Sequence, residues 1–345
     1  MRLGFIGGGV ICQLAHISAY QEISDCELTA LADDRVRSAQ VIARRYGVKR
    51  IYGDFREMLD REELDGVVIS TGYALHHALV PEVIERGIPL ITDVPIAASA
   101  ETAGRLVEMA DERGISYHLG YIRRFDPAVK MAKETVERWR ETGECGRITF
   151  VRITMPFRRW PYGMIDMKDE MEGGDFGLAP EPLPEYVPDS LKGTYLRFIG
   201  FYINQINLLR YLMDEEFEIK YVDPQNTLIV MTSQGGITCS LEMAQYGLKN
   251  RWEEFYKICF DDGKIDLKLA APLSRDVSDV MIYRGRSGEL IRPDLPGEWS
   301  AKVMAEHFVN SVLSGDHPIS PASEGVKDLN VAKQYIRRLN LDMGH

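Results

Sequence analysis

Hydrophobic residues in the first 120 positions follow two alternating patterns. Five short apolar runs are typical of buried strands, at 3–6, 27–32, 65–70, 88–92 and 116–120. Between these runs, apolar residues recur every three or four positions, as in amphipathic helices, and several of these segments end at a glycine. The alternation predicts an α/β fold that begins with a Rossmann domain at residues 1–123, built on a doubly wound parallel sheet.

From about residue 124 the pattern becomes that of a second domain. Asp126 and Pro127 predict the cap and first turn of a connecting helix. Runs rich in β-branched or aromatic residues then predict six strands, at 148–155, 217–222, 226–232, 236–243, 255–260 and 279–283. Because helices do not separate the last four, we predict a C-terminal α+β domain at 124–345 with an open, mainly antiparallel sheet, whose C-terminal helix packs back on the Rossmann domain.

A proline-rich segment at 156–192 interrupts the second domain and is too long for an idle connector. It predicts an arm or lid, with an ordered surface loop or a subunit contact as the alternatives. Trp160 and Tyr162 at its root are candidates to stack on a sugar ring, or they only anchor the arm.

Composition narrows the classes of function. The chain has 52 acidic and 41 basic residues, a net charge of -11, and no basic run that would neutralise nucleic-acid phosphates. Its five cysteines form no CxxC pair, which argues against a disulfide framework or a zinc site and favours a reducing cytoplasm. No apolar run approaches the roughly 18 residues of a membrane span. His76 and His77 point different ways on a helix and His118 lies in a buried strand, so we expect no metal site.

The strongest local motif is the glycine turn after the first apolar run. Gly7 to Gly9 follow a predicted strand and precede a predicted helix, where glycine permits positive φ and close backbone approach. Helix N-terminal amides can bind a pyrophosphate at such a turn. We therefore expect a dinucleotide to contact the turn through Gly7, Gly9, Val10 and Ile11.

Asp33 ends the second predicted strand, about twenty residues beyond the turn. A carboxylate there commonly binds the adenosine ribose 2′-hydroxyl and would repel a 2′-phosphate, which predicts NAD rather than NADP. Arg35 and Arg37 are the opposing signal, because either could reach a phosphate.

Five motifs carry a resemblance along essentially the whole chain. They are the glycine turn, Ile69-Ser70-Thr71 followed by His76, Ile91-Thr92-Asp93-Val94-Pro95, the segment Gly120 to Pro127, and Asn207-Leu208-Leu209-Arg210-Tyr211-Leu212. In these the chain resembles the Gfo/Idh/MocA family of glucose-fructose oxidoreductase and inositol dehydrogenase relatives.

The resemblance implies an NAD(P)-dependent oxidoreductase that acts on a sugar, sugar acid or polyol. It also implies a homodimer or homotetramer that pairs through the C-terminal sheet, and further cofactor contacts from Thr71, His76, Asp93 and Val94.

Three departures from the family pattern affect its chemistry. Val94 stands where the family signature has a lysine, and a valine carries neither proton nor charge. Gly200 and Asn204 stand where the family often has an aspartate and a histidine. Thr71-Gly72-Tyr73 replaces the family's Thr-Pro-Asn.

A non-standard acid–base group is therefore needed, because hydride transfer from an alcohol requires a base for the hydroxyl proton. The candidates are Tyr121, Arg123, His76, Asp93 and Tyr202. Tyr121 is the first of them, with packing between the domains as its alternative role. Arg123 and Asn204 are candidates to act beside it, although an asparagine amide orients a hydroxyl without removing its proton. Arg124 and Tyr202 are candidate substrate contacts, since a guanidinium can clamp a carboxylate or phosphate.

The function expected first is oxidation or reduction of a sugar-like alcohol or ketone. Two alternatives remain open: an NAD-assisted lyase or glycosidase-type reaction with transient oxidation, and a catalytically degenerate NAD-binding regulatory or binding protein.

Overall fold

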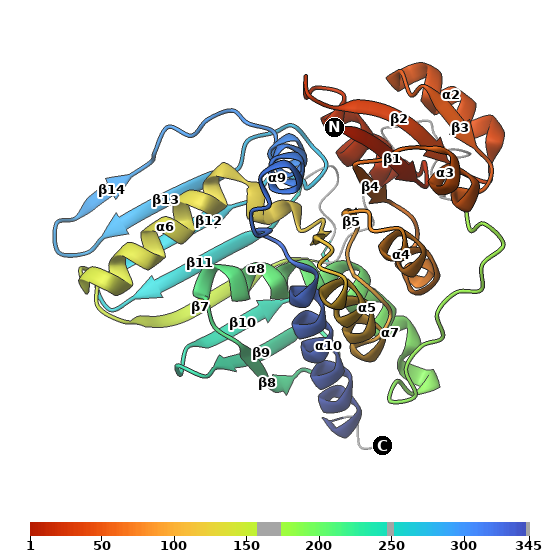
Figure 1. Ribbon diagram of the computed structural model, residues 1–345. Coiled ribbons are helices and arrows are strands. Elements are labelled where there is room, and N and C mark those ends of the chain that lie inside the picture. Colours follow the sequence, from red (N-terminus) through yellow and green to blue (C-terminus); the bar gives the residue numbers. More distant parts are fainter. Residues whose placement is uncertain (157–173, 247–251, 343–345) are drawn as a thin grey trace. The chain divides into compact units, whose positions relative to one another are not determined.

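The computed structural model describes residues 1–156, 174–246 and 252–342 (Figure 1). By contacts, the chain divides into two compact units. The described part of the first unit comprises residues 1–121, 174–185 and 301–329, and that of the second comprises the remaining described residues, 122–156, 186–246, 252–300 and 330–342.

The first unit is built on a six-stranded parallel sheet in the order β3-β2-β1-β4-β5-β6. Its strands are short, and all except the edge strand β3 are almost wholly buried, as expected for a sheet covered by helices on both faces. They are β1 (Arg2–Ile6), β2 (Glu27–Ala32), β3 (Arg50–Tyr52), β4 (Gly66–Ile69), β5 (Leu90–Thr92) and β6 (Tyr117–Leu119). The predicted Rossmann sheet is confirmed, and the short β3 was missed.

The predicted helices of the first unit begin and end largely where the sequence indicates, and the short helix at Phe55–Arg61 was missed. The Ser99 hydroxyl accepts from the Thr102 amide at 3.1 Å as the predicted cap, and Gly47 ends a helix in the left-handed region at φ 76°. The helices are α1 (Ser18–Tyr20), α2 (Val36–Tyr46), α3 (Phe55–Arg61), α4 (His76–Glu85), α5 (Ala100–Glu112) and α9 (Ser300–Ser314), whose residues from 301 belong to this unit.

The helix after the glycine turn departs from α geometry. Residues Cys12–Ile17 form a π-helical turn, and Cys12 is fully buried. Cys12 occupies the place of the third glycine or alanine of a dinucleotide motif, where a small residue lets helix and strand approach closely. The wider turn coincides with this larger side chain.

The second unit is built on an eight-stranded sheet in the order β14-β13-β12-β11-β7-β10-β9-β8. Every pair is antiparallel except β7 with β10, which run parallel. The strands are β7 (Ile148–Thr154), β8 (Phe217–Val222), β9 (Leu228–Ser233), β10 (Thr238–Glu242), β11 (Phe255–Phe260), β12 (Gly263–Lys268), β13 (Asp279–Arg284) and β14 (Glu289–Ile291). The predicted mainly antiparallel sheet is confirmed, and β12 and β14 were missed.

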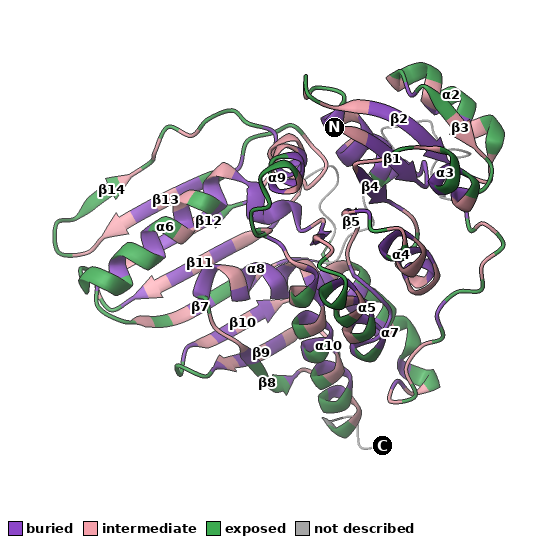
Figure 2. Cartoon of the chain, viewed as in Figure 1, coloured by how far each residue is buried: buried purple, intermediate pink, exposed green. Residues whose placement is uncertain are grey.

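One face of this sheet is covered by helices, as Figures 1 and 2 show. Trp139 is fully buried and meets Phe260 of β11 edge-on at 4.9 Å between ring centroids. The predicted Asp126 cap is confirmed, because its carboxylate accepts from the Ala128 amide at 2.9 Å. The helices of the second unit are α6 (Pro127–Thr142), α7 (Lys192–Arg197) and α8 (Ile203–Met213), with a π-helical turn at Phe198–Tyr202, and α10 (Ala322–Asp342), which belongs to this unit from residue 330.

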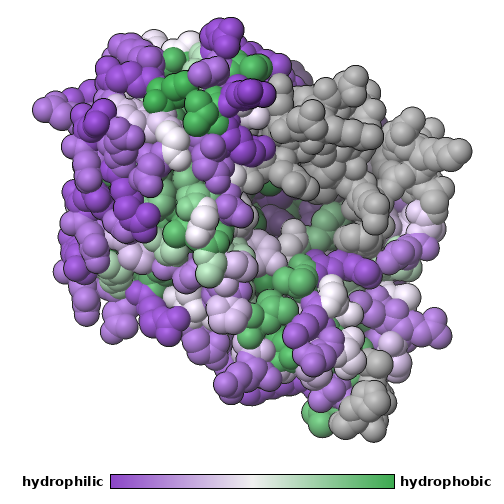
Figure 3. Space-filling view, turned by 90° about the vertical axis from the view of Figure 1, so that its right-hand side faces the viewer, coloured by the Kyte–Doolittle hydropathy of each residue, from purple (hydrophilic) through white to green (hydrophobic). Residues whose placement is uncertain are grey.

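Hydrophilic residues predominate on the surface drawn in Figure 3, with smaller hydrophobic groups between them, in keeping with the net charge of -11. Within the described residues, no helix combines the length and the apolar character that crossing a membrane requires.

Candidate functional site

The carboxyl ends of the parallel strands bring together residues that are far apart in the sequence. Gly7 follows β1, Asp33 follows β2, Ser70 follows β4 and Asp93 follows β5. The chain order reverses between the neighbouring strands β1 and β4. In doubly wound sheets, ligands bind at this edge and at such a switch point.

At Gly7 the turn is closed to any side chain. Its φ is 89°, and a Cβ there would lie 2.5 Å from the Ser70 carbonyl oxygen and 2.7 Å from Thr71 Cγ2. Its amide donates to the Ala32 carbonyl at 2.8 Å. The backbone of β1 therefore passes directly against the end of β4, which leaves a cradle that only glycine can form.

Asp33 supports this turn from within. Its side chain is fully buried, and Oδ2 accepts from the Gly8 amide at 2.8 Å. Arg35 donates to both carboxylate oxygens, from Nε at 3.0 Å and Nη2 at 2.9 Å. The carboxylate predicted to contact a ribose thus already holds the glycine turn and an arginine.

Asp34, the next residue, meets the described part of the proline-rich arm. Its Oδ2 accepts from the Phe176 amide at 2.7 Å, and Gly174 packs so closely that a Cβ there would overlap Oδ1. The Phe176 ring packs edge-on against Phe55 at 5.3 Å. This end of the arm therefore lies over the corner of the sheet after β2.

Farther along the arm, Glu181 is anchored in the first unit. Its carboxylate accepts from the Ala98 amide at 2.7 Å and the Ser99 hydroxyl at 2.9 Å, at the N-terminus of α5. Its own amide donates to the Ala74 carbonyl at 2.7 Å. A negative charge is favourable at a helix N-terminus, so this contact ties the arm down.

Asp93 lies at the centre of a second polar cluster on this edge. Oδ1 lies 2.9 Å from Nε2 of His16, a residue of the π-helical turn, and Oδ2 accepts from the Ser70 hydroxyl at 2.5 Å. His16 is 1% exposed and Asp93 is partly exposed, which leaves the carboxylate as the accessible member.

The other predicted cofactor residues differ in how far they are open to solvent. His76 is fully buried, and its Nδ1 lies 3.1 Å from the Ile96 carbonyl oxygen. Burial lowers the pKa of His76 to about 4, so its ring is neutral near pH 7. Gly9 and Val10 are buried, Ile11 is exposed, and Thr71 and Val94 are half-buried.

In the second unit, Arg123 is committed to a buried ion pair. Its Nη2 donates to Oε2 of Glu254, whose side chain is 1% exposed. Glu254 also accepts from Gln205 Nε2 at 2.8 Å and from Trp252 Nε1 at 3.2 Å. Arg123, predicted as catalytic, therefore ties the segment before α6 to the start of β11.

Arg124 is held in the same unit. Its Nε donates to Asn207 Oδ1 at 2.8 Å, and its guanidinium lies 4.7 Å from the centre of the Tyr211 ring. Both residues belong to α8, so the arginine predicted to contact a substrate also secures the helix.

The remaining candidates lie in varied surroundings. Asn204 of α8 is half-buried, and its Nδ2 donates to the carbonyl of Phe201 in the preceding π-helical turn at 3.2 Å. Tyr202 is 2% exposed and burial raises the pKa of its phenol. Tyr121, directly after Gly120 beyond the end of β6, is also buried. Trp160 and Tyr162 lie outside the described residues.

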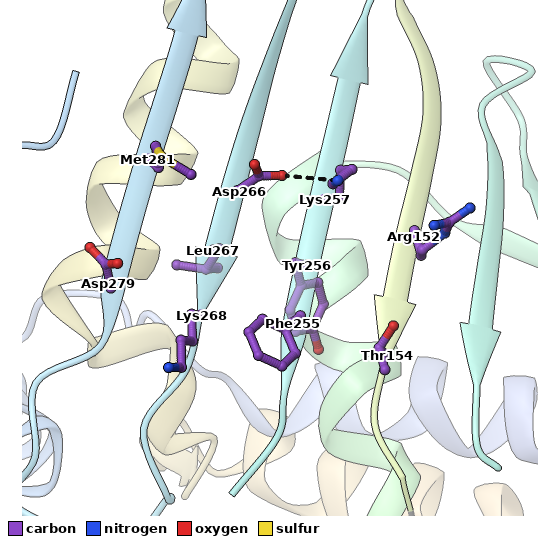
Figure 4. A pocket seen from close by; sticks show the side chains of 10 residues that line it. All are labelled: Arg152, Thr154, Phe255, Tyr256, Lys257, Asp266, Leu267, Lys268, Asp279 and Met281. Carbon is purple, nitrogen blue, oxygen red and sulfur yellow. Dashed lines mark ion pairs between the residues drawn. The ribbon is translucent and has the colours of Figure 1, made fainter. Parts of the chain in front are cut away.

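A depression of about 410 Å³ lies on the face of the second sheet away from α6 and α8 (Figure 4). Cross-strand charges face one another here: Lys257 Nζ lies 3.7 Å from Asp266 Oδ1, and Lys268 is paired in register with Asp279. Phe255 and Met281 supply apolar surface.

His16, Ser70, Glu181 and Glu254 were not singled out as site residues from the sequence. His16 lies on the predicted helix that follows the glycine turn, and this position could have identified it as a site residue. The other three are recognised only through partners distant in sequence. In the described part of the chain, acidic, histidine and cysteine side chains form no group of three that could hold a metal ion.

Comparison with known proteins shows which family the first unit resembles. Residues 1–121 match the model of the GFO_IDH_MocA oxidoreductase family, described as an NAD-binding Rossmann fold. The rhizopine catabolism protein MocA of Rhizobium meliloti is 32% identical over 135 residues, 39% of this chain and 42% of that protein. The myo-inositol 2-dehydrogenase of Thermotoga maritima is 26% identical over 223 residues, 65% of this chain and 58% of that protein. These matches thus span about half the length of the two relatives.

The fold agrees over a longer stretch. The structure of aldose-aldose oxidoreductase from Caulobacter crescentus, complexed with glycerol, superposes with a TM-score of 0.75 at 16% identity, and covers 99% of this chain and 98% of that one. Residues 1–121 are thus similar to the NAD-binding Rossmann domain of the GFO_IDH_MocA oxidoreductase family, and the whole chain shares its fold with the aldose-aldose oxidoreductase.

Proposed function

We propose that this protein is an NAD-dependent oxidoreductase that acts on a CH–OH group of a sugar, sugar acid or polyol. The observation that carries the proposal is the glycine cradle: Gly7 admits no side chain, and the buried Asp33 carboxylate fixes the Gly8 amide at 2.8 Å. A turn that excludes side chains at the switch point of a parallel sheet suits the backbone of a dinucleotide pyrophosphate.

Gly7, Gly9, Val10 and Ile11 would hold the pyrophosphate, with Asp33 and Asp34 on the adenosine side. NAD is preferred over NADP because two acidic residues end β2, although Arg35 could turn from Asp33 toward a phosphate. The relatives' names include both cofactors: a D-xylose 1-dehydrogenase of Haloferax volcanii is NADP(+)-dependent, and an Agrobacterium radiobacter oxidoreductase structure contains NAD+.

The nicotinamide, when bound, accepts or donates a hydride, so the chain's own task is to move the hydroxyl proton. Tyr121 is proposed for that role because it follows β6 and the Gly120 amide donates to the Thr92 carbonyl at 2.8 Å, beside Asp93. Arg123 and Asn204 would orient the hydroxyl, while Arg124, Trp160, Tyr162 and Tyr202 would contact the substrate. Thr71, His76, Asp93 and Val94 complete the proposed cofactor contacts.

Native mass spectrometry of the purified chain tests dinucleotide binding, and absorbance at 340 nm tests turnover. We expect retained or added NAD+ to bind, and NADH to form with at least one of myo-inositol, D-xylose, D-glucose and D-gluconate. Binding of NAD+ with no turnover of a broad panel of sugars, sugar acids and polyols would reject the oxidoreductase proposal. Exchange of a carbon-bound substrate hydrogen with solvent deuterium, without net NADH, would instead support the NAD-assisted lyase or glycosidase alternative.

Two observations favour a second candidate, an NAD-binding regulatory protein without chemistry. Val94 stands where the resembling family has a lysine, and the Asn204 amide donates to the carbonyl of Phe201 in the preceding π-helical turn. This candidate predicts that Val94→Lys combined with Asn204→His gains no activity over the unmodified chain. Measurable turnover by the unmodified chain would eliminate it.

For assembly and location, we propose a cytoplasmic homodimer or homotetramer that pairs through the second sheet. The support is the mixed charged and apolar face around Lys257, Asp266 and Met281 (Figure 4), which is self-complementary in charge. Light scattering of wild type and Met281→Glu tests this. A monomeric wild type would contradict it.

A further inference from the structure

The cluster of His16, Asp93 and Ser70 has the hydrogen-bonding pattern of an ionised carboxylate. Both Asp93 oxygens face a partner, the His16 Nε2 at 2.9 Å and the Ser70 hydroxyl at 2.5 Å. An ionised carboxylate accepts at both oxygens and retains lone pairs for a further contact. Asp93 is partly exposed, so its charge is open to a ligand at the edge of the sheet.

His16 supports that carboxylate. Its Nδ1 is buried, and no described residue offers it a hydrogen bond. With a hydrogen on Nε2, the ring donates to Asp93 Oδ1.

Two further titratable side chains that interact with Asp93, His76 and Cys12, are neutral at pH 7. Burial, the largest cause, lowers the pKa of His76 to about 4. Burial, followed by the charges of Asp93 and Asp33, raises the pKa of the Cys12 thiol. Neither group therefore offsets the carboxylate.

The strand order places this charge relative to a dinucleotide. If the pyrophosphate bound at the β1 turn and the adenosine toward the end of β2, the nicotinamide would extend to the opposite side, toward the ends of β4 and β5. Ser70 and Asp93 follow these two strands. The oxidised nicotinamide ring carries a positive charge and the reduced ring carries none.

We propose that Asp93, positioned by His16 and Ser70, makes the chain bind oxidised nicotinamide more tightly than reduced nicotinamide. The inference rests on the proposed dinucleotide function and deepens it: Asp93 selects between redox states, while His16 and Ser70 are positioning residues. Unlike charges at close range attract even when partly solvated, whereas a neutral ring gains nothing comparable.

The test is the ratio of dissociation constants for NADH and NAD+, measured by calorimetry on the full chain at pH 7 and low salt. For Asp93→Asn we expect the preference for NAD+ to fall about five- to tenfold. Asp93→Glu keeps the charge and is expected to keep the ratio within about twofold of wild type, even if both affinities fall. His16→Leu should lower the preference less than Asp93→Asn.

Asp65→Asn is the matched control, because Asp65 immediately precedes β4 at the opposite edge of the same sheet and binds Arg2. It should leave the ratio unchanged. If Asp93→Asn weakens both dinucleotides equally, the carboxylate has only a structural role and the inference is wrong, while the proposed function stands. If the wild type binds neither dinucleotide, both fail. If Asp93→Glu and Asp93→Asn show the same ratio of dissociation constants, the inference about Asp93 is also wrong.

Discussion

Two regions of this molecule bury charge in opposite ways. At the carboxyl edge of the parallel sheet, Asp33 and Asp93 accept from groups at neighbouring strand ends, and Asp93 stays partly exposed. In the second unit, Glu254 is buried and satisfied by Arg123, Gln205 and Trp252. The first arrangement organises a turn that a ligand can reach, whereas the second uses its polar groups for internal cohesion.

The difference teaches that the two units use their buried charges for different purposes. In the first unit, carboxylates hold the glycine turn and the ends of neighbouring strands. In the second unit, Arg123 and Arg124 secure β11 and α8. Four predictions test this contrast.

The largest expected effect is on the buried ion pair of the second unit. Glu254→Leu leaves the Arg123 guanidinium buried without its carboxylate, and should lower the free energy of unfolding by about 3–5 kcal/mol, measured by urea denaturation. The double variant Glu254→Leu with Arg123→Met should recover most of that loss. If the double variant recovers stability but loses NAD+ binding, Arg123 has a role at the site beyond cohesion.

In the first unit, Gly7→Ala should cost about 2–4 kcal/mol and abolish NAD+ binding, because the backbone is in the left-handed region and the Cβ would meet the Ser70 carbonyl. Gly47→Ala is the matched control: φ is also positive there, at 76°, but nothing lies within 4 Å of the added Cβ. It should cost about 1 kcal/mol and leave binding intact. If the Gly7→Ala variant keeps its affinity for NAD+, the glycine turn is not the NAD+ binding site.

Acid should destabilise the first unit before the second. Burial lowers the pKa of His76 to about 4 and of His118 to about 3, and the described second unit contains no histidine. Below the ordinary histidine pKa, the unfolded chain takes up protons that the folded chain excludes, so stability falls as pH drops from about 6.5 toward 4. Each buried histidine should cost about 2 kcal/mol at pH 5, measured by denaturation as a function of pH.

Replacing one of the two buried histidines should make the stability of the protein depend less on pH. His118→Gln is expected to reduce the slope of stability against pH between 5 and 6.5. His317→Gln serves as the control, since His317 is exposed in the folded chain and should leave the slope unchanged. Identical slopes in all three proteins would contradict the burial argument.

The smallest effect concerns the arm. Glu181→Gln weakens the charge-assisted contacts with the Ala98 amide and the Ser99 hydroxyl, which should lower stability by about 1–2 kcal/mol. Limited proteolysis should cut the arm faster in this variant than in Glu185→Gln, an exposed position on the same segment. Equal cleavage of both would mean that Glu181 does not hold the arm.

The fold was largely predictable because its signals are local. Alternating apolar periods, the caps at Ser99 and Asp126, and the stop at Gly47 each act within a few residues. The short edge strand β14 and the strand β12, which begins directly after Asp261 and Asp262, lacked a clear apolar run. The parallel pairing of β7 with β10 was also not predicted, because the sequence of a strand does not show which distant strand it pairs with.

The sequence by itself determined the parallel sheet, the glycine turn and the acidic residues after β2, because backbone preferences and apolar spacing specify these locally. Only the tertiary structure decided what the charged residues do. It joined Asp93 to His16 and Ser70, Glu254 to Arg123, and Glu181 to the start of α5. The physical reason is that the partner of a buried charge is set by which chain segments fold together, and these pairs are 23 to 131 residues apart.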